Sequence, residues 1–232
     1  MKNIVIDYRA SADTVDALCK MGFNIIKTPR LNTVYTTICG HSDIMIHKLN
    51  ENLVVTEPSV YEYFKEKLTD NTVIKGRSRL NNKYPFDIAY NAARVGEKIF
   101  CNEKFTDSVI INYANKNNIN IINTKQGYSK CSICVVSDNA IITSDKNIMV
   151  AAEKNKIDVL AVDDNRIKLE GFEHGFIGGS TGLIDKNTLV FNGDINFHSD
   201  ANRIIDFCNL YGVKPISLNN GPIVDIGSII AI

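Results

Sequence analysis

The sequence predicts an α/β fold: a five-bladed ββαβ propeller whose last unit is shared between the N- and C-terminal segments. Three observations carry this prediction. Short polar segments that lead into apolar runs recur about every 44 residues, each repeat has the same order of elements, and the spacing continues through the joined ends of the chain. Repeats of this length bury a core only against their neighbours, so a regular set of five predicts a closed array.

One residue marks the start of each unit, at the point where we expect a strand near the axis to begin. The marks are Asp43, Asp87, Cys131, Phe176 and Asp225. They are separated by 44, 44, 45 and 49 residues, and the step from the last mark through the two ends of the chain to the first is 50 residues. We therefore expect a single domain over residues 1–232, with units near 41–84, 85–128, 129–173, 174–220, and 221–232 plus 1–40.

Each unit continues with a second strand, a helix and a third strand. Short apolar runs bounded by turn residues predict the second strands at 53–56, 98–101, 140–143, 189–192 and 3–6. Amphipathic spacing predicts the helices at 60–68, 106–117, 147–155, 200–211 and 12–21. The third strands are expected at 72–75, 120–124, 158–162, 214–218 and 23–27. A final strand over 224–232 should pair with 3–6 and close the ring.

Composition excludes several functional classes. The chain has 26 basic and 26 acidic residues and no run of Lys or Arg, so nothing indicates a nucleic-acid partner. No apolar run approaches the roughly 20 residues of a membrane span. Six scattered cysteines without a secretory signal predict free, buried or half-buried thiols in a cytoplasmic protein. The glycine-rich stretch 178–182 lacks the Lys and the following helix of a phosphate-binding loop, so no cofactor is predicted.

Two segments on this repeat architecture resemble a known superfamily. The stretches 127–132 (GYSKCS) and 173–179 (EHGFIGG) are similar to an uncharacterised bacterial branch of the pentein, or guanidino-group-modifying enzyme, superfamily. That superfamily contains arginine deiminases, dimethylarginine hydrolases and amidinotransferases, and also a non-catalytic ribosome anti-association factor. The resemblance covers the whole chain and implies the pentein propeller.

The resemblance also implies positions for catalytic groups, and this chain departs from several of them. Catalytic members carry a Cys nucleophile on the final central strand, where Asp225 stands here, and a His in the third unit, near Tyr128. Tyr84 occupies the position of an acid before the second unit, whereas Asp43 and Asp87 match positions that carry acids. A standard guanidino hydrolase is therefore not predicted, and the sequence leaves open whether the protein is an enzyme.

Carboxylates are expected to converge near the axis. Residues two apart on a strand share a face, so His41 should point the same way as Asp43, and His174 the same way as Phe176. Converging carboxylates remain ionised only where a cation neutralises them, which predicts a cationic ligand. The candidate ligand-binding residues are Asp43, Asp87, Asp225 and Lys130. In the alternative interpretation, each Asp caps a turn in its own unit.

Cys131 is the one thiol at a repeat-equivalent axial position, which makes it a candidate nucleophile. A catalytic thiol needs a base or a positive field, which His41, His174 or Lys130 could supply. The candidate catalytic residues are therefore Cys131, His41 and His174, and the alternative is that Cys131 is a small buried residue. A metal site built from His41, Asp43 and His174 is a further alternative, but no metal-ligand spacing supports it and no metal is predicted.

Two functions follow from these observations. The first is an axial acidic pocket for a small guanidino or amino compound, in a hydrolase or transferase with Cys131 as a non-standard nucleophile. The second is a non-catalytic interaction protein or ligand sensor, as in the ribosome anti-association member of the superfamily. The neutral net charge disfavours ribosomal RNA as a partner. The oligomeric state is left open.

Overall fold

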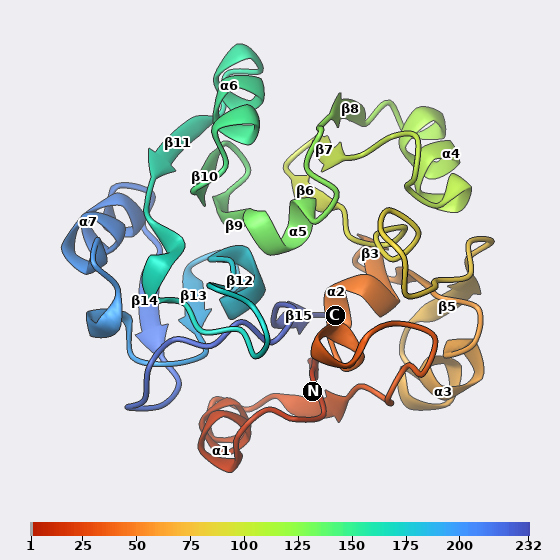
Figure 1. Cartoon of the computed structure of the whole chain (residues 1–232), viewed down its shortest axis with the longest axis horizontal. Helices are drawn as coiled ribbons and strands as arrows, with labels where there is room; N and C mark the ends of the chain where they lie inside the picture. The colour runs from red at the N-terminus through yellow and green to blue at the C-terminus, as the bar shows by residue number, and fades with distance from the viewer. Residues whose placement is uncertain (1) are drawn as a thin grey trace.

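The computed structural model describes residues 2–232, which form five three-stranded sheets around a central axis (Figure 1). The first sheet combines both ends of the chain, because β15 (Ile230–Ala231) pairs with β1 (Asn3–Ile6), which pairs with β2 (Asn24–Lys27). The other sheets consist of β3 (Ile46–Asn50), β4 (Leu53–Thr56) and β5 (Thr72–Lys75); β6 (Ala93–Val95), β7 (Lys98–Cys101) and β8 (Asn120–Asn123); β9 (Cys134–Ser137), β10 (Ala140–Thr143) and β11 (Asp158–Ala161); and β12 (Thr181–Asp185), β13 (Thr188–Phe191) and β14 (Lys214–Ser217).

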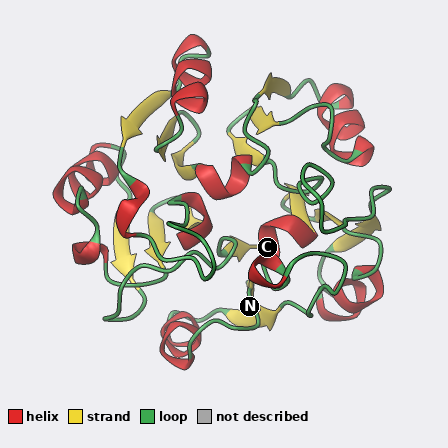
Figure 2. Cartoon of the chain, viewed as in Figure 1, coloured by secondary structure: helices red, strands yellow, loops and turns green. Residues whose placement is uncertain are grey.

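Helices occupy two positions in the molecule. Five lie at the outer rim: α1 (Ala12–Lys20), α3 (Tyr61–Lys67), α4 (Ser108–Lys116), α6 (Lys146–Lys154) and α7 (Ala201–Leu210). Two short helices, α2 (Ser42–Met45) and α5 (Ser129–Ser132), lie near the centre (Figure 2). Short 3₁₀ segments complete the chain: η1 (Thr36–Ile38), η2 (Asp164–Arg166), η3 (Gly178–Ser180) and η4 (Ile195–Phe197).

All five described sheets have the same topology. The first and second strands are antiparallel, and the outer helix returns the chain so that the third strand runs parallel to the second. The second strand is the most buried of each unit, and β1 and β10 are buried along their whole length. A strand that is buried on both faces consists of consecutive apolar residues, without the polar alternation of a half-exposed strand. This is why the second strands were predictable from the sequence.

The terminal segments close the ring as predicted, but through a shorter strand. Ile4 pairs with Ala231, and the amide of Ile232 donates to the carbonyl of Asn3 at 2.8 Å. The predicted strand over 224–232 is reduced to Ile230–Ala231. Left-handed backbone at Gly227 (φ 67°) and Ser228 (φ 71°) interrupts it, because an extended strand requires negative φ.

The predicted strand starts at the five repeat marks are wrong. Asp43 lies in α2 and Cys131 lies in α5, whereas Asp87, Phe176 and Asp225 lie outside helices and strands. The first strands begin only after these marks. Helical segments of four residues are too short to show a 3.6-residue period. The strands predicted from the apolar runs that follow were therefore placed to begin too early in the sequence. The argument that residues two apart share a face therefore does not apply at the axis.

The remaining boundaries agree with the predictions to within about two residues, the usual uncertainty of an element end. Among residues 2–232, no helix combines the length and apolar character that crossing a membrane requires.

Core packing yields a stability prediction with a matched control. Phe191 of β13 is fully buried, whereas 46% of Phe197 is exposed. Phe191→Ala should lower the free energy of unfolding by about 3–5 kcal/mol because it leaves a cavity. Phe197→Ala should lower it by less than about 1 kcal/mol. Urea unfolding measures both, and equal effects would contradict the packing described above.

Candidate functional site

Three side chains meet at the axis and form what we call the axial cluster: His41, Asp43 and Cys131. One side-chain N, O or S atom from each lies within 4.8 Å of the others, and all three residues are buried. The Cys131 thiol donates a hydrogen bond to Asp43 Oδ2 at 2.9 Å, and the Ser228 hydroxyl donates to the same oxygen at 2.8 Å. The cluster therefore joins α2, α5 and the C-terminal segment.

Asn91, which the sequence analysis did not single out, holds Cys131 in place. Its Oδ1 accepts hydrogen bonds from the amides of Lys130 (2.7 Å) and Cys131 (3.3 Å). Its Nδ2 donates to Cys131 Sγ at 3.2 Å. The unpaired amides at the start of a helix are usually satisfied by a neighbouring side chain. Here the cap comes from another unit, 39 or more residues away, so no local sequence pattern could reveal it.

His41 occupies the N-cap position of α2 and packs against Gly227. A Cβ at position 227 would lie 2.2 Å from His41 Cβ, so only glycine allows this approach. Neither ring nitrogen of His41 has a hydrogen-bond partner among residues 2–232, although the residue is only 2% exposed. The imidazole is thus a buried polar group with unused bonding capacity.

Asp225 accepts hydrogen bonds from one amide of its own unit and one of the fourth unit, so the alternative interpretation describes it only in part. Its carboxylate accepts hydrogen bonds from the amides of Phe176 and Gly227, each at 2.9 Å. Gly179 lies so close that a Cβ there would be 2.2 Å from a carboxylate oxygen. Burial, together with the nearby charge of Asp43, raises the pKa of Asp225 above its ordinary value, while His41 opposes the shift.

Asp87 belongs to a hydrogen-bonded chain of tyrosines. The Tyr128 hydroxyl donates to Asp87 Oδ2 at 2.6 Å, and the hydroxyls of Tyr35 and Tyr128 are 2.7 Å apart. Burial raises the pKa of Asp87. Burial and the hydrogen bond to Asp87 together raise the pKa of Tyr128, so Tyr128 is a neutral donor. Tyr128, which stands near the superfamily's His position, cannot serve as an imidazole-like base.

A cavity of about 260 Å³, the axial pocket, opens beside the cluster. His41, Cys131 and Asp225 contribute its buried polar groups. Aromatic side chains form much of the remaining wall: Tyr35, Tyr128, Phe172 and Phe176. Glu173 and His174 lie at its more exposed part, and the His174 Nδ1 is 2.9 Å from the carbonyl oxygen of Gly175. All three candidate catalytic residues therefore line one cavity.

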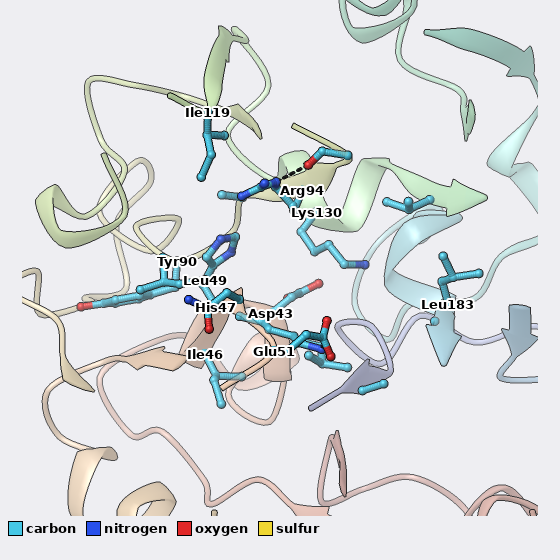
Figure 3. Close-up of a pocket in the computed structure, with 18 of the residues that line it drawn as sticks. Asp43, Ile46, His47, Leu49, Glu51, Tyr90, Arg94, Ile119, Lys130 and Leu183 are labelled. Carbon is cyan, nitrogen blue, oxygen red and sulfur yellow. Dashed lines mark hydrogen bonds and ion pairs between the residues drawn. The ribbon is translucent and has the colours of Figure 1, made fainter. Parts of the chain in front are cut away.

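The candidate ligand-binding residues do not share that cavity. Of Asp43, Asp87, Asp225 and Lys130, only Asp225 lines the axial pocket among the described residues. Asp43 and Lys130 line a second cavity of about 650 Å³, together with His47 and Arg94 (Figure 3). There the Lys130 ammonium donates to Ser228 Oγ at 3.1 Å. Since Asp43 touches both the second cavity and Cys131, it separates the two pockets.

The two cysteines of the C-x-x-C pattern have different environments. Burial and the charges of Asp43 and Asp225 raise the pKa of Cys131 well above its ordinary value, so Cys131 is a neutral thiol at rest. Cys134 begins β9 and packs in the core, where burial raises its pKa to about 11. All six cysteines, which lie within residues 2–232, are free. The prediction of free, buried or half-buried thiols is thus confirmed for five of them, whereas Cys19 is exposed.

Five ββαβ units around an axis, with the last unit shared between the terminal segments, define a protein of the pentein fold. The chain belongs to the DUF6873 family, a family of unknown function, which it matches over residues 5–230.

Solved structures show the same architecture. SxtG, an amidinotransferase from Microseira wollei, is 10% identical, with a TM-score of 0.54 over 94% of this chain and 88% of SxtG. DDAH from Pseudomonas aeruginosa, solved with citrulline, is 7% identical, with a TM-score of 0.57 over 93% of this chain and 91% of DDAH. Likeness at this identity shows the fold alone. No curated protein matches the chain.

The structure also gives a pH-dependent stability prediction at Asp164, which lies in η2 beside the loop that lines the axial pocket. Its Oδ2 accepts a hydrogen bond from Ser144 at 2.6 Å, and burial raises the pKa to about 6 from the ordinary 3.8. A raised carboxyl pKa stabilises the fold below about pH 4, and this contribution is lost as the pH rises through about 6.

Asp164→Asn removes this titration. From pH 4 to pH 7.5, the unfolding free energy of the variant should rise relative to wild type by about 2–3 kcal/mol. Asp163→Asn, at the exposed neighbouring position, is the control and should show no such change. Urea unfolding across this pH range measures the difference, and a constant difference for Asp164→Asn would contradict the assignment.

Proposed function

We propose that the axial pocket binds a small organic cation, a guanidino or amino compound, and that the protein is a hydrolase or transferase acting on that ligand. The charge of the lining carries the proposal. Asp225 and Glu173 contribute carboxyl groups, and the described part of the chain contributes no Lys or Arg to the pocket. A cation that enters this pocket offsets the charge of Asp225, which burial otherwise penalises, and is also attracted by the exposed carboxylate of Glu173.

The aromatic walls of the axial pocket also suit a small organic cation. A ring face attracts a cation within about 6 Å of its centroid, and the attraction strengthens when the cation is desolvated. The centroids of Tyr35 and Phe172 are 6.2 Å apart, so the two rings stand next to each other in the wall. A volume of about 260 Å³ accommodates a molecule of amino-acid size.

The Cys131 thiol would be the nucleophile of the proposed reaction. Two carboxylates oppose ionisation of Cys131 at rest, and a bound guanidinium would counter both of them. The proton would pass to Asp43, which already accepts the thiol hydrogen bond. The thiolate would then attack the guanidinium carbon and displace an amine, which would leave with the proton held by Asp43, and attack of water or a second amine on the same carbon would release the Cys131 sulfur. That similar solved structures include an amidinotransferase supports this class of reaction.

A second candidate function is binding without turnover, as in a ligand sensor. One observation favours it: Cys131 is a buried thiol engaged by both Asp43 and Asn91, which is typical of an unreactive cysteine. The sensor would use the same pocket and the same ligand class. The two candidates differ only in turnover, so the experiments below separate them.

Ligand binding is tested by thermal shift on protein freed of metals with a chelator. Arginine, agmatine, creatine and spermidine form the panel, and citrulline is the matched neutral ligand because a ureido group replaces the guanidinium. At least one cation should raise the melting temperature, because a ligand that binds only the folded state stabilises it by mass action. No shift across the panel, or an equal shift with citrulline, would contradict the proposal.

The aromatic wall provides a matched pair of variants. Phe172 and Phe86 are 52% and 51% exposed, but only Phe172 lines the axial pocket. Phe172→Ala should weaken cation binding by about 3–30-fold through the loss of a cation–π contact. Phe86→Ala should leave the affinity unchanged. Calorimetric titration of both variants with the best ligand of the panel makes the comparison.

Turnover depends on Cys131 if it is the nucleophile. For a ligand that wild type converts, Cys131→Ala should lower kcat by about a thousandfold or more while binding persists. Cys19→Ala, at an exposed cysteine of α1, should retain wild-type turnover. Turnover that survives in Cys131→Ala would remove Cys131 as the nucleophile. Binding by wild type with no conversion of any ligand would favour the sensor.

A further inference from the structure

The axial cluster combines three kinds of metal-ligating atom in one buried place. His41 contributes an imidazole nitrogen, Asp43 a carboxylate oxygen and Cys131 a sulfur, all within 4.8 Å of one another. The residues are 2%, 1% and 3% exposed. His41 and Asp43 lie at the start of α2 and Cys131 lies in α5, 88 residues after Asp43, so only the closed ring brings the three together.

Several polar atoms of these groups have no hydrogen-bond partner, which indicates that a ligand binds between them. Both ring nitrogens of His41 and Oδ1 of Asp43 are buried without a hydrogen-bond partner in the part of the chain that the structure describes. Leaving a buried polar atom unpaired costs about 1–3 kcal/mol, and more for a charged group. Three such atoms in one cluster lower the stability of the fold unless a ligand binds them.

Surrounding hydrogen bonds hold the three side chains in place. Ser228 Oγ donates to Asp43 Oδ2 at 2.8 Å, Asn91 Nδ2 donates to Cys131 Sγ at 3.2 Å, and the His41 ring packs on Gly227. Metal sites characteristically have such outer contacts, which orient the ligating groups before the metal binds. The cluster is therefore arranged in advance.

From these observations we propose that His41, Asp43 and Cys131 bind a divalent zinc-type metal ion. A mixed nitrogen, oxygen and sulfur set suits Zn²⁺ or Co²⁺ and does not suit Mg²⁺ or Ca²⁺, which prefer oxygen ligands. Binding of the ion displaces the proton of the Cys131 thiol, which leaves to solvent, and the resulting thiolate binds the ion. One thiolate and one carboxylate then balance the charge of the ion.

The ion would have an open position toward the axial pocket. His41 and Cys131 both line that pocket, whereas both oxygens of Asp225 already accept backbone hydrogen bonds. Three protein ligands with a fourth position open to solvent or substrate are typical of catalytic zinc sites. This inference does not rest on the proposed function, because metal binding is a property of the cluster without any organic ligand.

The metal-bound and metal-free clusters assign different roles to Cys131. In the metal-free protein its sulfur is a thiol that could act as a nucleophile, and in the loaded protein it is a ligand. Metal is therefore expected to protect the sulfur from the chemistry proposed above. The metal titration below contains no guanidino or amino compound, and the cation panel contains no metal, so failure of one proposal is distinguishable from failure of the other.

The test is a titration of chelator-treated wild-type protein with Co²⁺ alone, followed by Zn²⁺ competition against a chromophoric chelator. Wild type should bind one equivalent of Co²⁺ with a thiolate-to-cobalt charge-transfer band, and Zn²⁺ should displace the cobalt. Since this band is recorded on wild type, it does not depend on how any variant folds. Absence of stoichiometric binding, or binding without the thiolate band, would overturn the proposal.

Substitutions in the axial cluster test which side chains bind the metal ion. Cys131→Ser should abolish the charge-transfer band and weaken Zn²⁺ binding by about 100-fold or more, and His41→Ala should also weaken it by at least about tenfold. Cys19→Ser is the matched control outside the cluster and the axial pocket, and it should bind as wild type does. Circular dichroism checks that each variant is folded. Unchanged zinc affinity in a folded Cys131→Ser protein would contradict the site.

Discussion

The C-terminal segment that crosses the centre of the ring is the constraint on which the rest of the structure depends. The carbonyl of Gly227 accepts hydrogen bonds from the Asp43 amide (3.0 Å) and the Ser42 hydroxyl (2.8 Å), while the amide of Ser228 donates to the carbonyl of Gly179 at 2.7 Å. Buried backbone groups require partners, and at the axis these come from different units. One short segment thus joins the first and fourth units and delivers Asp225 and Ser228 to the site.

Close packing around this segment explains the small residues of the centre. A side chain at Gly179 would collide with the Asp225 carboxylate, and one at Gly227 would collide with His41. The glycine-rich stretch after Phe176 is therefore a place of close approach and not a phosphate cradle. The equivalent acids of the repeat have accordingly diverged: Asp225 caps backbone amides, whereas Asp43 accepts hydrogen bonds from a thiol and a hydroxyl.

Electrostatics link the pocket to the cluster beneath it. Burial makes negative charge costly near the axis, which keeps Cys131 protonated and raises the pKa values of Asp87 and Asp225. Positive charge relieves this cost, whether it arrives as an organic cation in the pocket or as a metal ion in the cluster. Under both proposals, a cation changes the ionisation state of the Cys131 thiol.

The sequence by itself determined the number of units, their order and their closure. Second strands such as 98–101 and 140–143 are buried on both faces, so their apolar runs are unambiguous, and Asp43, Asp225 and Cys131 stood out through their repeat positions. Tertiary structure alone decided which of these groups meet. Asn91 reaches Cys131 from another unit, and Lys130 faces the second cavity, because contacts across a closed ring depend on how units pack and not on spacing along the chain. Short helical turns at the axis, too brief to show a period, set the final direction of each side chain.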